Sequence, residues 1–364
     1  MPPQPPELME ELVEEVLLRF PPDDPASLVR AALVCKLWCR LVSGTAFHRR
    51  FRKFHRSRAP LLGMVYTGGC KVRHDDTPGD TDDHFVKPVR IMPVSTAYFV
   101  PTTSFHPVHS ADGRSGWHAI DARHGRVLLY RSYPWPRRHG FSIWDPVTDE
   151  QRDLPELPFN TRHRWSAAVA CAATAGGSCN HLDCHGGPFL VVVMGIQARV
   201  MRLSVYSSEA GAWSQPADLE HPTPSLLGFF GRASSVLVGS ALYFLVRIND
   251  EIVKYDMATR EVSKIHLPSK FLHLLKQQSI VLMTDDHGGL GFVASCMEYQ
   301  LELWSMVAGG DAGFVLTRVI DLVKLLPCRA LIKNSPQVSG FADVGASRFL
   351  FMRTSDGLYS IEIN

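Results

Sequence analysis

The spacing of hydrophobic side chains changes once along the chain. From Leu8 to about His55 they recur at helical spacing, whereas beyond Pro60 they form short runs interrupted by Gly, Pro and Asp. The first pattern is typical of amphipathic helices, and the second of β-strands joined by tight turns. We therefore predict a helical module over residues 1–58 and a large all-β domain over residues 59–364.

The helical module is expected to contain three or four short helices. Leu8, Leu12, Val16 and Phe20 follow one another in steps of four residues, so they line one face of a helix that ends at Pro21. Further helical runs cover residues 25–35, 37–42 and 47–54. Short helices depend on tertiary contacts, so this module requires a partner. The pattern alone leaves open whether that partner is another protein or the chain's own all-β domain.

A structural unit recurs in the all-β domain: a strand, a tight turn, a strand ending in an aromatic residue, a polar turn and Leu-Pro. Two copies cover residues 125–155 and 240–268, and in both the aromatic is followed by Asp-x-x-Thr, at Trp144 and at Tyr255. Asp and Thr side chains cap turns, so we expect them to stabilise the turn that leads into the next strand.

The aromatic residues at strand ends indicate how many units there are. They lie 49 to 62 residues apart, at Trp144, Tyr206, Tyr255, Trp304 and Tyr359. Four-stranded blades of a β-propeller repeat at about 40–50 residues. We predict a propeller of about six blades, in which the last strand, around residues 357–363, closes onto the first blade.

Two segments of the helical module resemble the F-box. Residues 8–21 resemble its opening, and residues 28–42 resemble its second half, with Val-Cys-Lys-x-Trp and the helix-ending Pro in the expected order. Met9 departs from the Pro that usually follows the first Leu. In the all-β domain, the order of residues 123–129, residues 143–148 and then Leu-Pro resembles the F-box-associated, kelch-like propeller of plant F-box proteins. The expected fold is a small all-α head followed by a large all-β propeller.

The resemblance implies docking onto a Skp-type adaptor and, through it, a cullin ubiquitin ligase, while the propeller holds a target protein. The residues that the resemblance assigns to the adaptor-binding surface are apolar: Leu8, Leu12, Val16, Leu17, Pro21, Leu28, Val34, Trp38 and Leu41. Some of them must instead hold the helices together, and for Trp38 both roles stay open.

Two alternatives to a ligase receptor remain: an F-box scaffold or sensor without ligase output, and a propeller enzyme or small-molecule binder. Neither Gly-x-Ser-x-Gly nor His-Glu-x-x-His occurs, so we expect a non-catalytic protein without a cofactor. Residues 289–294 imitate a dinucleotide loop but precede a strand pattern, which predicts a blade turn. The target is not identified, and candidate target-binding loops cover residues 71–84, 133–139 and 175–187.

Composition places the chain among ordinary globular proteins, with 45% hydrophobic residues, 20% charged residues and a formal net charge of +2. Its eight cysteines lack the spacing of a disulfide framework, which fits a reducing compartment. The N-terminus does not resemble a signal peptide, and no apolar run is long enough to span a membrane. We expect a cytoplasmic or nuclear protein.

Five zinc-type donors gather in one segment, at Cys171, Cys179, His181, Cys184 and His185. Thiolate and imidazole are the ligands that zinc prefers, yet the spacing matches no standard finger. The segment is also rich in Gly, Ser and Asn, which is typical of a polar loop. We therefore predict no metal here.

A basic run follows the acidic start of the chain. Between Arg30 and Arg58 there are nine Lys or Arg residues and no acidic one. Nucleic-acid binding and a solvated or adaptor-facing basic surface are the two interpretations. The basic residues interleave with a helical stripe of Phe, which favours the second, and we expect no nucleic-acid partner.

Overall fold

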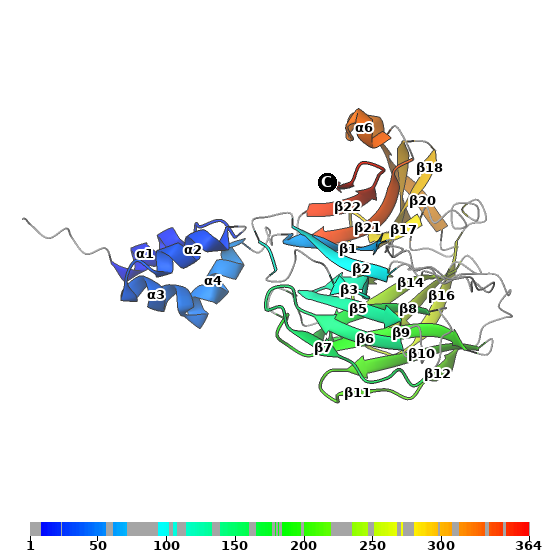
Figure 1. The fold of residues 1–364 in the computed structure, drawn as a ribbon, viewed down its shortest axis with the longest axis horizontal. Helices are drawn as coiled ribbons and strands as arrows, with labels where there is room; N and C mark the ends of the chain where they lie inside the picture. The colour runs from blue at the N-terminus through cyan, green and yellow to red at the C-terminus, as the bar shows by residue number, and fades with distance from the viewer. Residues whose placement is uncertain are drawn as a thin grey trace, which may run out of the picture.

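The computed structural model consists of a helical head and a ring of β-sheets (Figure 1). It describes residues 9–22, 24–55, 61–70, 94–101, 105–107, 114–132, 139–159, 165–176, 179, 181, 184–197, 200–219, 235–246, 251–267, 271, 280–297, 299–307, 313–331, 335–344 and 347–363. The predicted domain boundary, between residues 58 and 59, lies outside these residues, as do the candidate loop at 71–84 and all but the last residue of the candidate loop at 133–139.

Four helices form the head: α1 (Glu10–Leu17), α2 (Pro25–Ala32), α3 (Lys36–Ser43) and α4 (Thr45–His55). The start of α2 follows from its sequence, because Pro25 suits the first helical position and the Asp24 carboxylate accepts a hydrogen bond from Ser27 N at 3.3 Å. Gly44 follows the last residue of α3. The expectation of three or four short helices is confirmed.

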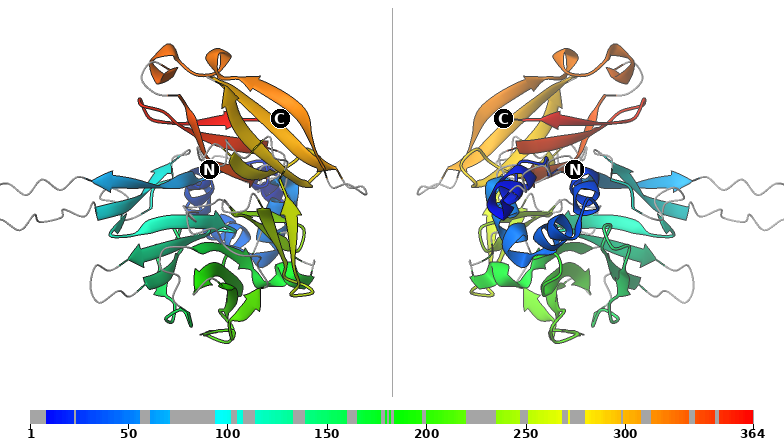
Figure 2. Two further views of the ribbon diagram at one scale, coloured as in Figure 1. Left: turned by 90° about the vertical axis from the view of Figure 1, so that its right-hand side faces the viewer. Right: turned by 90° about the vertical axis from the view of Figure 1, so that its left-hand side faces the viewer.

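Six antiparallel sheets surround a common centre (Figure 2). The first sheet contains β1 (Gly63–Cys70), β2 (Val94–Pro101) and β3 (Arg114–Ser115). The second contains β4 (His118–Arg123), β5 (Arg126–Ser132), β6 (His139–Trp144) and β7 (Gln151–Asp153). The third contains β8 (Trp165–Cys171), β9 (Phe189–Gln197), β10 (Val200–Ser207), β11 (Ala212–Trp213) and β12 (Ala217–Leu219), with a 3-10 helix η1 (Ala172–Gly176) between β8 and β9.

The remaining sheets follow in chain order. The fourth contains β13 (Ser235–Val238), β14 (Ala241–Val246), β15 (Glu251–Asp256) and β16 (Val262–His266). The fifth contains β17 (Ile280–Thr284), β18 (Leu290–Met297), β19 (Gln300–Val307) and β20 (Gly313–Asp321), and η3 (Leu322–Lys324) and α6 (Cys328–Leu331) come next. The sixth contains β21 (Gln337–Val344), β22 (Ser347–Arg353) and β23 (Leu358–Glu362). The prediction of a propeller with about six blades is confirmed.

The aromatic residues used to count the blades occupy equivalent strands. Each lies on the third strand of its blade, in β6, β10, β15, β19 and β23. The turns after two of them are alike: Asp145 Oδ1 accepts from Val147 N and Thr148 N at 2.8 and 3.4 Å, and Asp256 Oδ1 accepts from the two equivalent N–H groups at 3.0 and 3.4 Å. In both copies the Thr hydroxyl accepts from the N–H two residues on, at 3.3 Å. The expected role of Asp and Thr is confirmed.

Hydrophobic clusters join consecutive blades. The junction between the fourth and fifth blades, for example, buries Phe271, Phe292, Trp304 and Phe314 among aliphatic residues of β14 and β17. The ring of Phe271 lies 4.9 Å from those of both Phe292 and Trp304, in edge-to-face contact. Similar clusters occupy the other four junctions from the first to the sixth blade. Among the described residues, no such cluster joins the sixth blade to the first.

The expected closure of the ring by the last strand is wrong. β23 pairs antiparallel with β22 in its own blade, from Arg353 opposite Leu358 to Phe349 opposite Glu362. The reason is local: the Thr354 hydroxyl accepts from Asp356 N and Gly357 N, which builds a tight turn directly after β22. A strand leaving such a turn meets the free edge of β22 before any other partner.

The segment that imitates a dinucleotide loop is a blade turn, as expected. Gly289 N donates to Asp285 Oδ1 at 2.7 Å in the turn between β17 and β18. The next residues, Leu290–Met297, form β18 rather than a helix. A helix N-terminus for pyrophosphate is therefore lacking at this place.

Candidate functional site

The interior of the helical head is small. Its fully buried side chains are Val13, Leu17, Leu18, Ala31 and Phe47. Partly buried residues of α2, α3 and α4, including Leu28, Trp38, Leu41 and Phe51, pack around them together with Phe20, which follows α1. The His55 imidazole of α4 also donates a hydrogen bond to the Leu18 carbonyl at 2.7 Å, which ties the last helix to the end of the first.

The nine apolar residues assigned to adaptor binding fall into two groups in the head. Leu17 has no exposed surface and belongs to the interior, and Leu28, Trp38 and Leu41 lie half-buried against it. The others are accessible: Leu12, Val16 and Val34 expose 49%, 55% and 66% of their surface, and Pro21 is exposed. Leu8 lies outside the described residues.

Four further large apolar residues of the head are exposed, although the sequence resemblance did not select them: Met9, Val29 and Leu33 near the selected residues, and Phe54 of α4. Their positions follow the periodicity of the helices. Met9 precedes Leu12 by three residues, which places both on one side of the chain as it enters α1. Val29 and Leu33 are four residues apart at the end of α2. A search for the i, i+3 and i+4 partners of the selected residues would have found Met9, but not Val29 or Leu33, which are i, i+4 partners of each other.

Two arginines of the basic run form ion pairs within the head. Arg40 of α3 pairs with Glu10 at 3.2 Å, and Arg50 of α4 pairs with Glu14 at 2.7 Å and Glu15 at 3.6 Å. These ion pairs bring the acidic face of α1 onto α3 and α4. Exposed pairs stabilise a protein by only about 0–1 kcal/mol each, but they remove charge from the surface that nucleic acid would need. These contacts fit the interpretation of the basic run as a solvated surface rather than a nucleic-acid-binding one.

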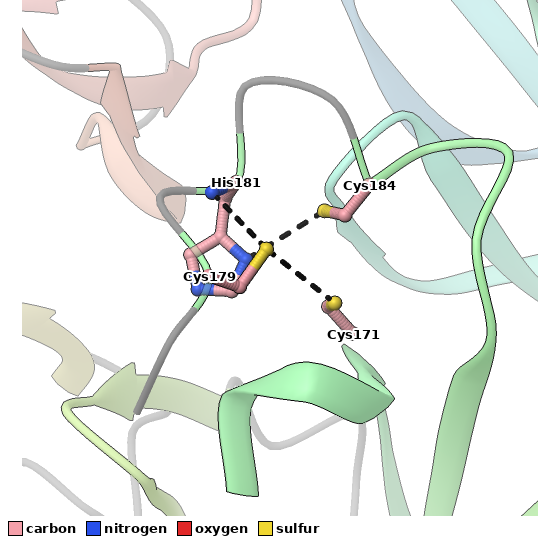
Figure 3. Close-up of side chains that lie close together, drawn as sticks. All are labelled: Cys171, Cys179, His181 and Cys184. Carbon is pink, nitrogen blue, oxygen red and sulfur yellow. Dashed lines mark hydrogen bonds between the residues drawn. The ribbon is translucent and has the colours of Figure 1, made fainter. Parts of the chain in front are cut away.

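A second cluster of functional groups lies in the propeller, where β8 ends (Figure 3). The side chains of Cys171, Cys179, His181 and Cys184 point toward one another, and their donor atoms all lie within 4.8 Å of one another. Cys171 is the last residue of β8, whereas the other three belong to the connection to β9. His185, the fifth donor noted in the sequence, is exposed and does not belong to the group.

The group is held by residues of the neighbouring blade. Cys171 N donates to His124 Nδ1 at 3.3 Å, and the rings of His124 and His181 stack 3.9 Å apart. Burial, together with the nearby His181 and two Arg side chains, lowers the pKa of His124 to about 3. Burial and the neighbouring thiols raise the pKa of Cys184 to about 12. His124 is thus neutral at physiological pH, as its acceptor role requires.

Arg126 of β5 binds the connection between β8 and β9. Its side chain is buried, at 5% exposed, and it donates from Nη2 to the carbonyl oxygens of Cys184, at 2.9 Å, and Gly187. The guanidinium also lies over the Phe189 ring, 5.1 Å from its centroid. Burial lowers the pKa of Arg126, and negative charge on Cys184 or Cys171 opposes that shift.

A polar network connects the second, third and fourth blades beside this cluster. Asp121 of β4 forms an ion pair with Arg123 and accepts a hydrogen bond from Val169 N of β8 at 2.8 Å. Arg123 continues to the Ser235 carbonyl and hydroxyl of β13. Burial raises the pKa of Asp121, while Arg123 and the N–H group oppose that rise. The inner strands of three blades are therefore fixed by charge as well as by apolar packing.

Comparison with known protein families identifies both the propeller and the helical head. Residues 118–363 match the family model described as F-box protein AT5G49610-like, beta-propeller, and residues 6–50 match the F-box domain. The chain belongs to this family of plant F-box proteins. The F-box match contains α1, α2, α3 and the first half of α4, so the head is an F-box. No curated protein matches the chain.

Solved structures similar to this F-box protein are distant. The β-propeller domain of the Trilobed protease from Pyrococcus furiosus is 7% identical, with 77% of this chain and 75% of that chain covered and a TM-score of 0.37. A luciferin-regenerating enzyme is 12% identical, with 72% and 82% covered and a TM-score of 0.35. Neither likeness bears on function. In the part of the F-box protein that the structure describes, no helix has the length and apolar character to cross a membrane.

Proposed function

We propose that this F-box protein is the substrate-recognition subunit of an SCF-type cullin ubiquitin ligase. The head binds a Skp-type adaptor, and the propeller binds the target protein. The observation that carries the proposal is the set of exposed apolar side chains on α1 and at the end of α2, which lie within the residues matched by the F-box model. The protein makes or breaks no bond itself, and it works in the cytoplasm or nucleus of a plant cell.

The energetics of the head support a docking role. Its interior contains few side chains, so much of the apolar surface of α1 and α2 stays in water unless a partner covers it. Leu12 and Val16 are about half exposed, so covering them would each contribute about half of the roughly 1.5–3 kcal/mol of full burial, before the costs of ordering the interface. We assign the docking surface to the accessible residues: Leu12, Val16, Pro21 and Val34, with Met9, Val29 and Leu33 beside them. Leu17 supports this surface from within.

The propeller supports the second half of the proposal. Its six blades form a rigid frame, and loops over a rigid frame are where binding specificity is usually found. The target would therefore be selected by loops at the rim, whereas the blades supply only their positions. A scaffold or sensor without ligase output would bind the adaptor through the same head. It would differ from a ligase receptor only in that the bound protein is not marked for degradation.

Affinity purification of the full chain from plant cells, with and without a proteasome inhibitor, tests the proposal. We expect a Skp-type adaptor, a cullin, and a further protein that accumulates when the inhibitor is present. The double variant Leu12→Glu with Val16→Glu should lose the adaptor and the cullin but keep the further protein. A matched control is Val315→Glu, at an exposed valine of β20 in the propeller.

Two results would count against the ligase role. If neither adaptor nor cullin is recovered with the wild-type chain, the docking role of the head is wrong. If both are recovered but the captured protein has the same half-life in cells with and without the F-box protein, the scaffold role replaces the ligase role.

A further inference from the structure

Four potential metal ligands converge where β8 ends, and adaptor binding makes no use of them. Each contributes one donor atom: the sulfur atoms of Cys171, Cys179 and Cys184, and a ring nitrogen of His181. Cys171 and Cys184 are buried, and the other two are half-buried. The three thiols are free rather than joined in a disulfide. Buried polar groups that face only one another require an explanation.

Two separations between donor atoms match a tetrahedral zinc site. With Zn–S and Zn–N bonds of about 2.3 and 2.0–2.1 Å, tetrahedral geometry places two sulfur ligands about 3.8 Å apart and a sulfur and a nitrogen about 3.5 Å apart. Cys171 Sγ lies 3.8 Å from Cys179 Sγ, and Cys184 Sγ lies 3.6 Å from His181 Nδ1. These two separations are those of a tetrahedral site, and all the donor atoms lie within 4.8 Å of one another.

A backbone hydrogen bond orients part of the cluster. His181 N donates to Cys179 Sγ at 3.4 Å, in a turn where His181 has φ of 58°. The left-handed conformation of His181 is uncommon for a residue with a side chain, and here it turns both the N–H and the imidazole toward the cysteines.

The charge around the cluster also suits a metal with three thiolates. Zn²⁺ with three thiolates and a neutral imidazole carries one net negative charge. Arg126 lies beside it with its side chain buried, and within the described ranges its Nη1 has no hydrogen-bond partner. A buried guanidinium next to a negatively charged metal site compensates that charge.

We propose that Cys171, Cys179, His181 and Cys184 bind one Zn²⁺ ion as a structural site. All four positions are filled by protein, which is typical of structural rather than catalytic zinc. The ion would join the end of β8 to the connection that leads to β9. Through His124, which binds Cys171 N and stacks on His181, it would also fix the third blade to the second. This role is independent of the proposed ligase function.

The chain spacing explains why the sequence argued against a metal. Cys179, His181 and Cys184 form a compact knuckle, but Cys171 lies eight residues earlier, at the end of a strand. Standard fingers take two ligands from each of two short motifs. Here one ligand comes from the sheet and three from the connection, and only the fold brings them together.

Metal analysis of the purified full-length protein tests the proposal. The chain is produced in zinc-supplemented medium without chelators, and we expect about one zinc per chain. Cys179→Ser and His181→Asn should each lower the bound zinc at least tenfold. The matched controls are His185→Asn, at the neighbouring exposed histidine, and Cys328→Ser, at an exposed cysteine of α6, and both should retain the metal.

A second measurement does not depend on whether the variants fold. Wild-type protein loaded with Co²⁺ in place of zinc should show the visible absorption of tetrahedral cobalt and a sulfur-to-metal charge-transfer band. Wild-type protein that contains no stoichiometric zinc and binds no tetrahedral cobalt would overturn the proposal. A Cys171–Cys179 disulfide found by mass spectrometry, or equal loss of zinc in His185→Asn and His181→Asn, would overturn it as well.

Discussion

The F-box head and the propeller differ in how far each can bury its own apolar side chains. The described junction between the fourth and fifth blades alone buries 14 hydrophobic residues, whereas the head buries five and leaves Leu12, Val16 and Val34 in water. The propeller therefore supplies its own stability, since each blade packs on the next. The head buries only a small interior and leaves its other apolar side chains exposed. A docking module requires such an exposed apolar surface.

The largest effect is expected in the propeller, for Phe292→Ala. Phe292 is fully buried and contacts the rings of Phe271, Trp304 and Phe314, so its removal should leave a cavity. We expect a loss of about 3–5 kcal/mol in the free energy of unfolding. Urea denaturation followed by circular dichroism measures it, with Val315→Ala as an exposed control that should change stability by less than about 0.5 kcal/mol. Similar losses in both variants would mean that this junction does not carry the stability of the ring.

Leu17→Ala tests how much a buried side chain, compared with an exposed one, contributes to the stability of the head. Leu17 is fully buried, so the substitution should cost about 2–5 kcal/mol, a large share of what so small an interior provides. Hydrogen exchange should then become fast throughout α1–α4 and stay unchanged in the blades. Leu12→Ala is the control, because Leu12 is half-exposed and its loss leaves the interior intact. Faster exchange in the blades as well would show that the two parts are one cooperative unit.

The Asp turn of the blades should contribute less, about 0.5–1.5 kcal/mol per hydrogen bond. Desolvation opposes the shift, but hydrogen bonds from Ala258 N and Thr259 N lower the pKa of Asp256 below its usual value of 3.8. A lowered pKa in the folded state means that the stabilisation is present above pH 3.8 and is lost as the pH falls through the folded-state pKa.

Denaturation of Asp256→Asn at pH 7 and at pH 3 measures this contribution. The variant should be less stable than wild type at pH 7, and the difference should shrink at the lower pH. Lys264→Gln changes charge on the adjacent strand β16 and serves as the control. A difference that is the same at both pH values would contradict the assigned hydrogen bonds.

The smallest effect is expected at Met9, where the chain departs from the usual F-box residue. Met9 precedes α1 with φ of −58°, a value that proline adopts without strain. Met9→Pro should stabilise the head by about 0.4–1 kcal/mol, by restricting the unfolded chain. Slower hydrogen exchange in α1 would show it, whereas Met9→Ala should not. Destabilisation by proline would mean that the conformation before α1 differs from the one described.

Local sequence patterns predicted the fold because local chemistry determines most of it. The Asp-x-x-Thr turns at Asp145 and Asp256 fold through hydrogen bonds within five residues, and the strand-end aromatics repeat with the blades. The error at the last strand has the same origin. The turn at residues 354–357 returns the chain onto β22, and its local preference prevailed over the expected pairing with the first blade.

The sites were harder to predict because they depend on which face of an element is covered. Leu12, Val16 and Leu17 look alike in the sequence, yet only Leu17 points into the interior of the head. The cysteine cluster is similar: Cys171 joins the other ligands only because β8 ends beside their connection. Spacing along the chain does not reveal either arrangement.

Binding of a purified Skp-type adaptor to the purified full-length protein tests the central claim most directly. Calorimetry should show one-to-one binding by the wild-type chain and by Val315→Glu. Leu12→Glu with Val16→Glu should bind at least about 100-fold more weakly, because the apolar contribution of both side chains is lost and two carboxylates would be buried without partners. Circular dichroism must show the same helix content in all three proteins. Equal adaptor affinity for the double variant and the wild type would contradict the assignment of the docking surface to the exposed face of α1.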